Sequence, residues 1–169
     1  MSELNIANIP AAGDAGDERV MRSVVQRVDR ASVSVGGRMI SRIERGLLVF
    51  LGVERGDIEG DADFLLEKII NLRVFEDTQG KMNLSLIDTS GSMLIISQFT
   101  LLADCRKGRR PSFTAAEDPG DAKRLYDYFI AKAGERVSSV GAGEFQAMMK
   151  IDSTNDGPVT LLLDSRKQF

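Results

Sequence analysis

The sequence contains no histidine, no tryptophan and a single cysteine, Cys105, in 169 residues. The lack of histidine excludes Ser-His-Asp and Cys-His nucleophilic machinery within the chain. It also argues against a zinc site, because Cys105 is the only soft metal ligand left. We therefore expect neither metal nor cofactor, and proton transfer must rest on carboxylates, lysine, tyrosine, water or the substrate itself.

Other features are missing as well. One cysteine cannot form an internal disulfide, which fits a reducing compartment. No apolar run approaches the roughly 20 residues of a membrane span. The N-terminus also lacks the basic region followed by an apolar region that is typical of a secretion signal. With 43% hydrophobic residues, the chain is long enough for one compact core. These observations predict a single-domain cytoplasmic protein.

Charge is uneven along the chain. The formal net charge of −3 comes entirely from residues 1–20, which hold four acidic side chains against Arg19. The remaining residues carry 21 of the 22 basic and 21 of the 25 acidic side chains. An Ala/Gly/Asp-rich stretch at 11–17 has no apolar period. We expect residues 1–20 to be a disordered acidic extension and 21–169 to form one domain.

Apolar periodicity predicts many strands and two helices. Amphipathic helices are expected over 61–73, with Asp61 as N-cap, and over 121–133. Strands are expected at 22–29, 31–35, 39–43, 46–53, 82–87 and 92–103, and on both sides of Gly157-Pro158. Gly36-Gly37 predicts a hairpin. Because strands and helices do not alternate strictly, we expect an α+β fold with a mostly antiparallel, barrel-like sheet.

Polar residues interrupt the strand predicted over 92–103. On a strand, Ser97 and Phe99 would face one way, and Gln98 and Thr100 the other. A buried hydroxyl or amide needs a partner. These side chains either satisfy neighbouring backbone at a strand end or line a pocket that binds a ligand carbonyl. Thr100 is a doubtful nucleophile, because no histidine can deprotonate it.

Two further segments could form binding surfaces, one through exposed main-chain carbonyls and the other through positive charge. Asn155-Asp156-Gly157-Pro158 lies between apolar runs, where Gly and Pro expose main-chain carbonyls and little else. This is either a plain loop or a rigid pocket wall. Arg106, Lys107, Arg109 and Arg110 place four cations in five residues. They form either a solvated loop or a phosphate-binding patch.

One arginine lies within the first strand. Arg27 stands between apolar residues, where it either snorkels to the surface or reaches a carbonyl or carboxylate partner.

Six segments, in this order, resemble the D-aminoacyl-tRNA deacylases, also called D-tyrosyl-tRNA deacylases. They are VQRV at 25–28 with ASV at 31–33, GLLV at 46–49 with LGV at 51–53, GKMNL at 80–84, SQFTL at 97–101, RPSF at 110–113 and NDGPVT at 155–160. Together the resemblance covers residues 21–169. The first twenty residues fall outside it.

The resemblance implies a homodimer that hydrolyses the ester between a D-amino acid and the 3′-terminal adenosine of tRNA. Gly157-Pro158 would be a cis peptide that reaches into the partner's pocket and excludes L side chains, while glycine would pass. Arg27 would orient this loop. The four residues Ser97, Gln98, Phe99 and Thr100 would line the aminoacyl-adenosine pocket. The basic residues 106, 107, 109 and 110 would contact tRNA.

Without histidine or metal, such chemistry would rest on positioning and on backbone N–H groups that stabilise an oxyanion, with the ribose 2′-OH helping to activate water. Two rival interpretations remain. One is a non-catalytic RNA-binding module whose basic loop, residues 106–110, grips tRNA. The other is a structural dimer whose polar residues only satisfy an interface.

Overall fold

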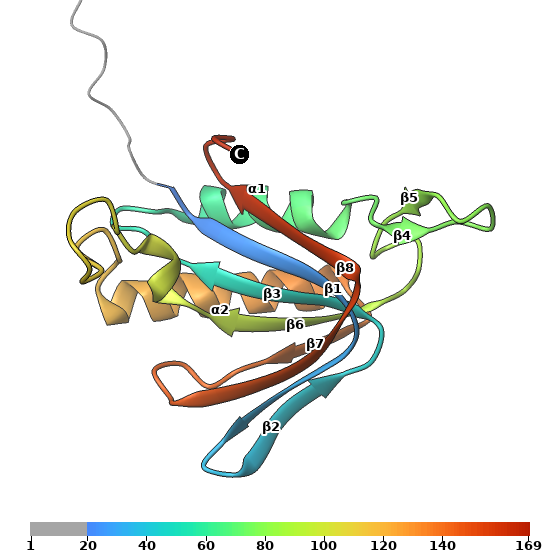
Figure 1. Ribbon diagram of the computed structural model, residues 1–169, viewed down its shortest axis with the longest axis horizontal. Coiled ribbons are helices and arrows are strands. Elements are labelled where there is room, and N and C mark those ends of the chain that lie inside the picture. Colours follow the sequence, from blue (N-terminus) through green and yellow to red (C-terminus); the bar gives the residue numbers. More distant parts are fainter. Residues whose placement is uncertain (1–19) are drawn as a thin grey trace, which may run out of the picture.

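One long strand organises the sheet. The computed structural model describes residues 20–169, so the predicted extension lies outside the described residues except for Val20. Strand β1 (Arg22–Val35) pairs antiparallel with β8 (Met149–Asp164) along one edge. Its other edge pairs first with β3 (Gly46–Gly52) and then with β2 (Arg38–Ile43). β6 (Ser92–Ser97) and β7 (Ser139–Ala142) extend the sheet beyond β3 (Figure 1).

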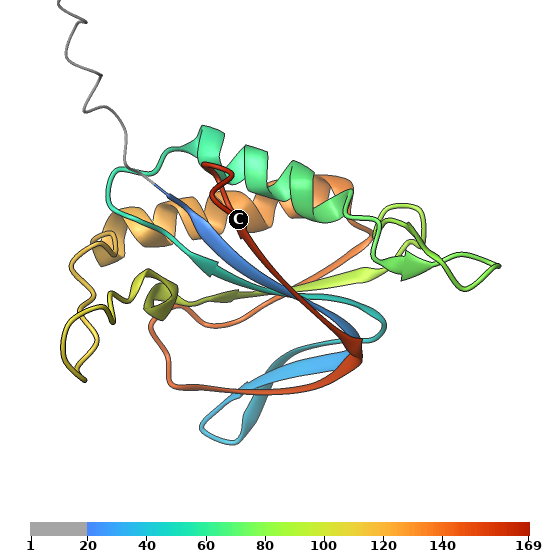
Figure 2. The same cartoon turned by 45° about the horizontal axis from the view of Figure 1, so that its top comes forward.

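Two helices cover one face of this sheet, as the rotated view shows (Figure 2). α1 spans Glu59–Ile70 and α2 spans Pro119–Arg136. Their apolar stripes complete a core with the buried strand residues, and this core includes Leu47, Val49, Leu65, Ile69, Ile95, Leu125 and Phe129. Burial of this stripe supplies the main stabilisation of both helices.

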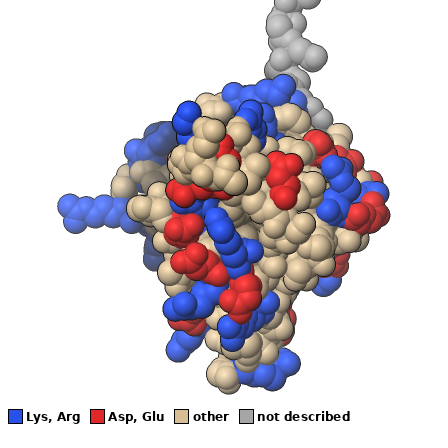
Figure 3. Space-filling view, turned by 90° about the vertical axis from the view of Figure 1, so that its right-hand side faces the viewer, with Lys and Arg blue, Asp and Glu red and all other residues tan. Residues whose placement is uncertain are grey.

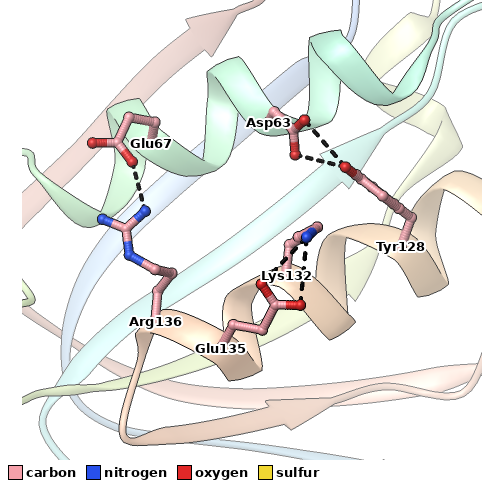
Figure 4. A network of polar contacts seen from close by, with 6 residues as sticks. All are labelled: Asp63, Glu67, Tyr128, Lys132, Glu135 and Arg136. Carbon is pink, nitrogen blue, oxygen red and sulfur yellow. Dashed lines mark hydrogen bonds and ion pairs between the residues drawn. The ribbon is translucent and has the colours of Figure 1, made fainter.

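Polar pairs join the exposed sides of the two helices (Figure 4). Tyr128 donates its hydroxyl hydrogen bond to Asp63 at 2.9 Å, and Arg136 lies 3.0 Å from Glu67. Lys132 pairs with Glu135 within α2 at 3.3 Å. These side chains are exposed, so each pair adds little stability and the charged face simply remains solvated.

The sheet curls over, so that its own strands cover the face opposite the helices. A second core cluster contains Val28, Ala31, Val33, Ile43, Leu48, Leu94 and Ile96, with Met149 and Ile151 packed against it. The far half of β1, with β2 and the first half of β8, therefore folds over β3 and β6. The resulting sheet is nearly closed and barrel-like, as predicted.

The structure corrects several details of the sheet. β3, β6 and β7 run parallel to one another, so the sheet is mixed. β1 is continuous where a break after Asp29 was expected. β7 was not predicted, because Ser139–Ala142 is short and rich in small residues. β8 is one strand that contains Gly157-Pro158, where two strands were expected.

Helix boundaries and turns follow the sequence more closely. Ile58 is the N-cap of α1 where Asp61 was expected, and Asp61 instead accepts the Ile58 N–H at 3.0 Å. The Gly36-Gly37 hairpin is confirmed, with φ of 57° and 81°. A small hairpin of β4 (Phe75–Glu76) and β5 (Met82–Leu84) flanks the sheet. No helix among the described residues is long and apolar enough to cross a membrane.

Candidate functional site

A hollow of about 580 Å³ opens where β6 ends and α2 begins. Most of its walls are apolar, and its polar groups come from the end of β6, the segment before α2 and Gln146 between β7 and β8. Its lining includes Val53, Ser97, Gln98, Phe99, Ala116, Glu117, Ala122, Phe145 and Met149. This volume lies in the range of small-molecule sites, where apolar walls and a few placed polar groups are typical.

The strand predicted over 92–103 ends at Ser97. A 3-10 helix, η1 (Phe99–Leu102), follows it. Gly52 allows this turn to pack closely, because a Cβ there would lie 2.5 Å from Leu102 Cδ2 and 3.0 Å from the Gln98 carbonyl oxygen. The alternation predicted for Gln98 and Thr100 is therefore wrong, since alternation requires an extended chain.

The turn brings the predicted polar residues together. Gln98 donates its backbone N–H to the Leu51 carbonyl at 2.8 Å, and its side-chain amide hydrogen-bonds the Thr100 hydroxyl. Ser97, Gln98 and Phe99 line the hollow, whereas Thr100 stands exposed beside it. Phe99 is 56% exposed, which leaves this end of the hollow open.

Gly157-Pro158 is a cis peptide within β8. The register with β1 is irregular here, passing from Thr160 opposite Gln26 to Asn155 opposite Val28. Gly157 has φ of +128°, and a Cβ there would lie 3.0 Å from Arg27 Nη2. Only glycine fits both the backbone and the space. The dipeptide itself is exposed.

Arg27 anchors this loop from inside the protein. Its side chain is only 6% exposed. Arg27 Nε donates to the Asp156 carbonyl at 3.1 Å and lies 3.1 Å from the Asp156 carboxylate. Arg27 Nη1 donates to the Val74 carbonyl at 2.6 Å, in the connection that follows α1. The snorkelling interpretation is therefore wrong.

The side chain of Asn155 closes the loop from the other side. Its Oδ1 accepts the Val159 N–H at 2.9 Å, and its Nδ2 donates to the Thr160 hydroxyl at 3.0 Å. No role was predicted for Asn155 by itself. Its signal was present, because an Asn side chain commonly bonds backbone near a turn.

The hollow and the Gly157-Pro158 loop do not meet within one chain. Neither residue belongs to the lining of the hollow. Arg27 and Gly157 lie at the β1–β8 edge, whereas Ser97 lies at the end of β6, with β3 between β1 and β6. Within a single chain, the Gly157-Pro158 loop therefore lies apart from the hollow, although the resemblance assigns both to one site.

The basic loop is closed at its base by backbone pairing between Asp104 and Ser112, at 2.7 and 3.0 Å. Asp104 also binds Arg106 through two side-chain contacts of 2.9 and 2.8 Å. Hydrogen bonds from Arg106 hold the pKa of Asp104 far below its usual range. Arg106 is thus already paired.

Three cations of the loop remain without such a partner. Among the described residues, no carboxylate pairs with Lys107, Arg109 or Arg110, and all three are exposed. The face beside β4 and β5 differs, because acidic and basic side chains are mixed there (Figure 3). The loop connects to the hollow through Phe113, whose ring lies 5.1 Å from that of Phe99.

Two titratable side chains near the hollow, Tyr126 and Glu117, differ in how deeply they are buried. Burial raises the pKa of Tyr126 to about 12, and its hydroxyl donates to the Ile95 carbonyl at 2.8 Å. It is therefore a structural donor, not an acid-base group near neutral pH. Glu117, which was not predicted as a site residue, is half-buried in the lining.

Among the described residues there is no cluster of three or more side chains suited to a metal ion.

Comparison with known proteins agrees with this architecture. The family model for D-Tyr-tRNA(Tyr) deacylase matches residues 24–164. A D-aminoacyl-tRNA deacylase of Syntrophus aciditrophicus is 64% identical over 149 residues, 88% of this chain and 100% of that protein. One of Kosmotoga olearia is 59% identical with the same coverage.

Solved structures show the same fold. A structure described as c-Myc DNA Unwinding Element Binding Protein has 41% sequence identity and a TM-score of 0.80, covering 84% of this chain and 97% of that one. A probable eukaryotic D-amino acid tRNA deacylase matches in fold with a TM-score of 0.76 at 18% identity, covering 86% of this chain and 99% of that one. Because the family model spans most of the chain, and relatives above half identity are covered over their whole length, this chain belongs to the D-Tyr-tRNA(Tyr) deacylase family.

Proposed function

We propose that this enzyme hydrolyses the ester of D-aminoacyl-tRNA to free D-amino acid and tRNA, and that Gly157-Pro158 rejects L-aminoacyl-tRNA. The observation that carries the proposal is the exposed Gly157-Pro158 loop, which buried Arg27 holds from inside the protein. A fixed backbone at the surface suits recognition by shape. The carbonyls would crowd an L side chain and leave a D side chain in open space.

The filter completes a site only if a second copy supplies it. In a homodimer, Gly157-Pro158 of one subunit would cover the open end of the partner's hollow. The outer sheet face supports such pairing, because Leu162 is 55% exposed opposite half-buried Val24. Phe99 adds exposed apolar surface at the hollow itself. A subunit interface that includes both places would cover these exposed apolar side chains.

The chemistry follows from what the hollow offers. Its apolar walls accept the terminal adenosine and place the ester carbonyl near Gln98 and Thr100. Water attacks this carbonyl while the vicinal 2′-OH helps to accept its proton. Backbone N–H groups of the turn stabilise the tetrahedral oxyanion, and the C–O bond to the ribose 3′-oxygen then breaks as that oxygen takes a proton. No protein nucleophile is required.

Substrate range follows from exclusion by shape. Glycine carries no side chain, so glycyl-tRNA passes the filter and is hydrolysed as well. The enzyme thereby acts in cytoplasmic proofreading of translation. Lys107, Arg109 and Arg110 contact the phosphates next to the 3′ end, and Arg106 keeps the loop closed through Asp104.

Release of tyrosine from D-tyrosyl-tRNA and L-tyrosyl-tRNA tests the proposal directly. We expect rapid release from the D form, none above background from the L form, and release of glycine from glycyl-tRNA. Tight binding without release would instead support the RNA-binding module. No affinity for tRNA would support the structural dimer.

Substrate ending in 2′-deoxyadenosine tests the role of the substrate hydroxyl. We expect this D-tyrosyl-tRNA to resist hydrolysis while it still binds. Normal turnover on it would overturn the substrate-assisted step and leave the rest of the assignment in place.

A further inference from the structure

Glu117 is a carboxylate in an otherwise uncharged hollow. Among the described residues that line the hollow, it is the only one with a charged side chain. Its neighbours in the lining include Val53, Ala116, Pro119 and Ala122, all apolar. A half-buried charge in such surroundings is costly unless it has partners. Its presence here therefore calls for a specific explanation.

The backbone holds Glu117 in place. Its own N–H donates to the Val53 carbonyl at 3.0 Å, next to the bridge between Glu54 and Ala116. One carboxylate oxygen accepts the Gly56 N–H at 2.7 Å and the other accepts the Asp118 N–H at 2.8 Å. The connection that follows β3, together with Asp118, thus positions the carboxylate in advance.

The same contacts keep Glu117 ionised. Partial burial acts to raise its pKa, but the two backbone N–H groups and nearby Arg55 outweigh this and hold the pKa of Glu117 below its usual range. An ionised carboxylate only accepts hydrogen bonds, and its two oxygens offer about four acceptor sites. With two backbone donors bound, acceptor capacity remains for a ligand.

We propose that Glu117 reads the 6-amino group of the 3′-terminal adenine, which makes it a specificity-determining residue for this substrate. The inference rests on the proposed function, in which the hollow holds the terminal adenosine. The flat apolar base suits the walls, and its donor edge then needs a polar partner. The ribose hydroxyl stays beside the reacting ester near Gln98. A base with a carbonyl oxygen at position 6 would face Glu117 as acceptor against acceptor.

Three D-tyrosyl-tRNAs test this recognition. Their terminal nucleoside is adenosine, purine riboside (which lacks the 6-amino group) or inosine (which has a carbonyl oxygen there). For the wild-type enzyme we expect kcat/KM to fall about tenfold for purine riboside, as one charge-assisted hydrogen bond at a half-exposed site implies. For inosine it should fall further, because the two acceptors repel.

Glu117→Ala separates recognition from a structural role. If Glu117 reads the base, this variant loses activity on adenosine but shows no difference between adenosine and purine riboside. If Glu117 has only a structural role, kcat/KM falls equally for all three substrates and the wild-type preference for adenosine persists. That result would overturn the inference. Glu117→Gln should restore relative activity on inosine, because its amide can donate.

Controls keep the outcomes distinct. Glu135→Ala removes an exposed carboxylate of α2 whose one partner among the described residues is Lys132, and it should leave all three rates unchanged. Thermal melting identifies a variant that fails to fold, and Glu117→Gln then replaces Glu117→Ala. Wild-type hydrolysis of all three substrates at equal rates would overturn the role of Glu117 but not the deacylase function. Absence of any hydrolysis would overturn the function itself.

Discussion

The two halves of the proposed site differ in how firmly one chain holds them. Gly157-Pro158 is fixed by buried Arg27 and by Asn155, which bonds backbone across the loop. The opposite half is open, with Thr100 exposed and Phe99 more than half exposed. The proposed selectivity element is therefore fixed by contacts within one chain, whereas the proposed reacting end of the hollow stays open. A second subunit that brings its own loop would cover that end.

Removing the anchor of the loop should have the largest effect. Arg27→Ala leaves the Val74 and Asp156 carbonyls and the Asp156 carboxylate without their buried cation. We expect a loss of about 3 kcal/mol in the free energy of unfolding and a sharp fall in discrimination between D- and L-tyrosyl-tRNA. Urea denaturation and the two hydrolysis rates measure these effects.

Arg30→Ala is the matched control, because Arg30 is an exposed arginine on the same strand. It should change neither quantity appreciably. Full selectivity in a folded Arg27→Ala variant would show that the loop does not depend on its anchor.

A methyl group at Gly157 should act more locally. Gly157→Ala forces an L side chain into φ of +128° and against Val159 and Arg27. We expect destabilisation of about 1–3 kcal/mol and loss of most D-tyrosyl-tRNA hydrolysis. Gly80→Ala is the matched control, since Gly80 also has positive φ, at +73°, but open space around its Cβ position. Equal losses of activity in both variants would contradict a specific role for the loop.

The basic loop should govern affinity and leave selectivity untouched. Replacing Lys107, Arg109 and Arg110 together by alanine should reduce the slope of log affinity for tRNA against log salt by about 2, since each single-strand phosphate contact contributes about 0.7. Arg106→Ala should change the slope little, because Asp104 already neutralises Arg106. A larger loss with Arg106→Ala than with the triple variant would reverse this division of roles.

Thr100→Ala should have the smallest effect. The Thr100 hydroxyl bonds the Gln98 side chain, and no histidine is available to activate it. We expect kcat/KM on D-tyrosyl-tRNA to stay within about tenfold of wild type, as for loss of one positioning contact. Complete loss of activity, with the fold intact by thermal melting, would point to a side-chain nucleophile.

The sequence predicted the family and most of the fold better than the arrangement of the candidate site. Patterns of apolar residues located both helices and most strands, and the six family segments indicated the catalytic class. The turn at Ser97 was missed because it depends on Leu51 and Gly52, which are distant in sequence. The Val74 carbonyl, which accepts a hydrogen bond from Arg27, is also distant from Arg27 in sequence. Such tertiary contacts override local pattern and cannot be seen in it.

Glu117 was missed for the same reason. In sequence it is one acidic residue before a helix, which usually marks only a solvated helix start. Its place in the hollow follows from pairing between the segments around Val53 and Ala116. Long-range pairing again decides what a short motif does.

Mixing two inactive variants tests most directly the claim that hollow and loop come from different subunits. One variant is Gly157→Ala, with a defective loop, and the other is Ala122→Trp, whose added side chain fills the hollow. After the two are unfolded and refolded together in equal amounts, random pairing into twofold dimers should restore about a quarter of wild-type D-tyrosyl-tRNA hydrolysis. Each variant alone stays inactive. Two folded variants that remain inactive in mixed dimers would contradict the shared site.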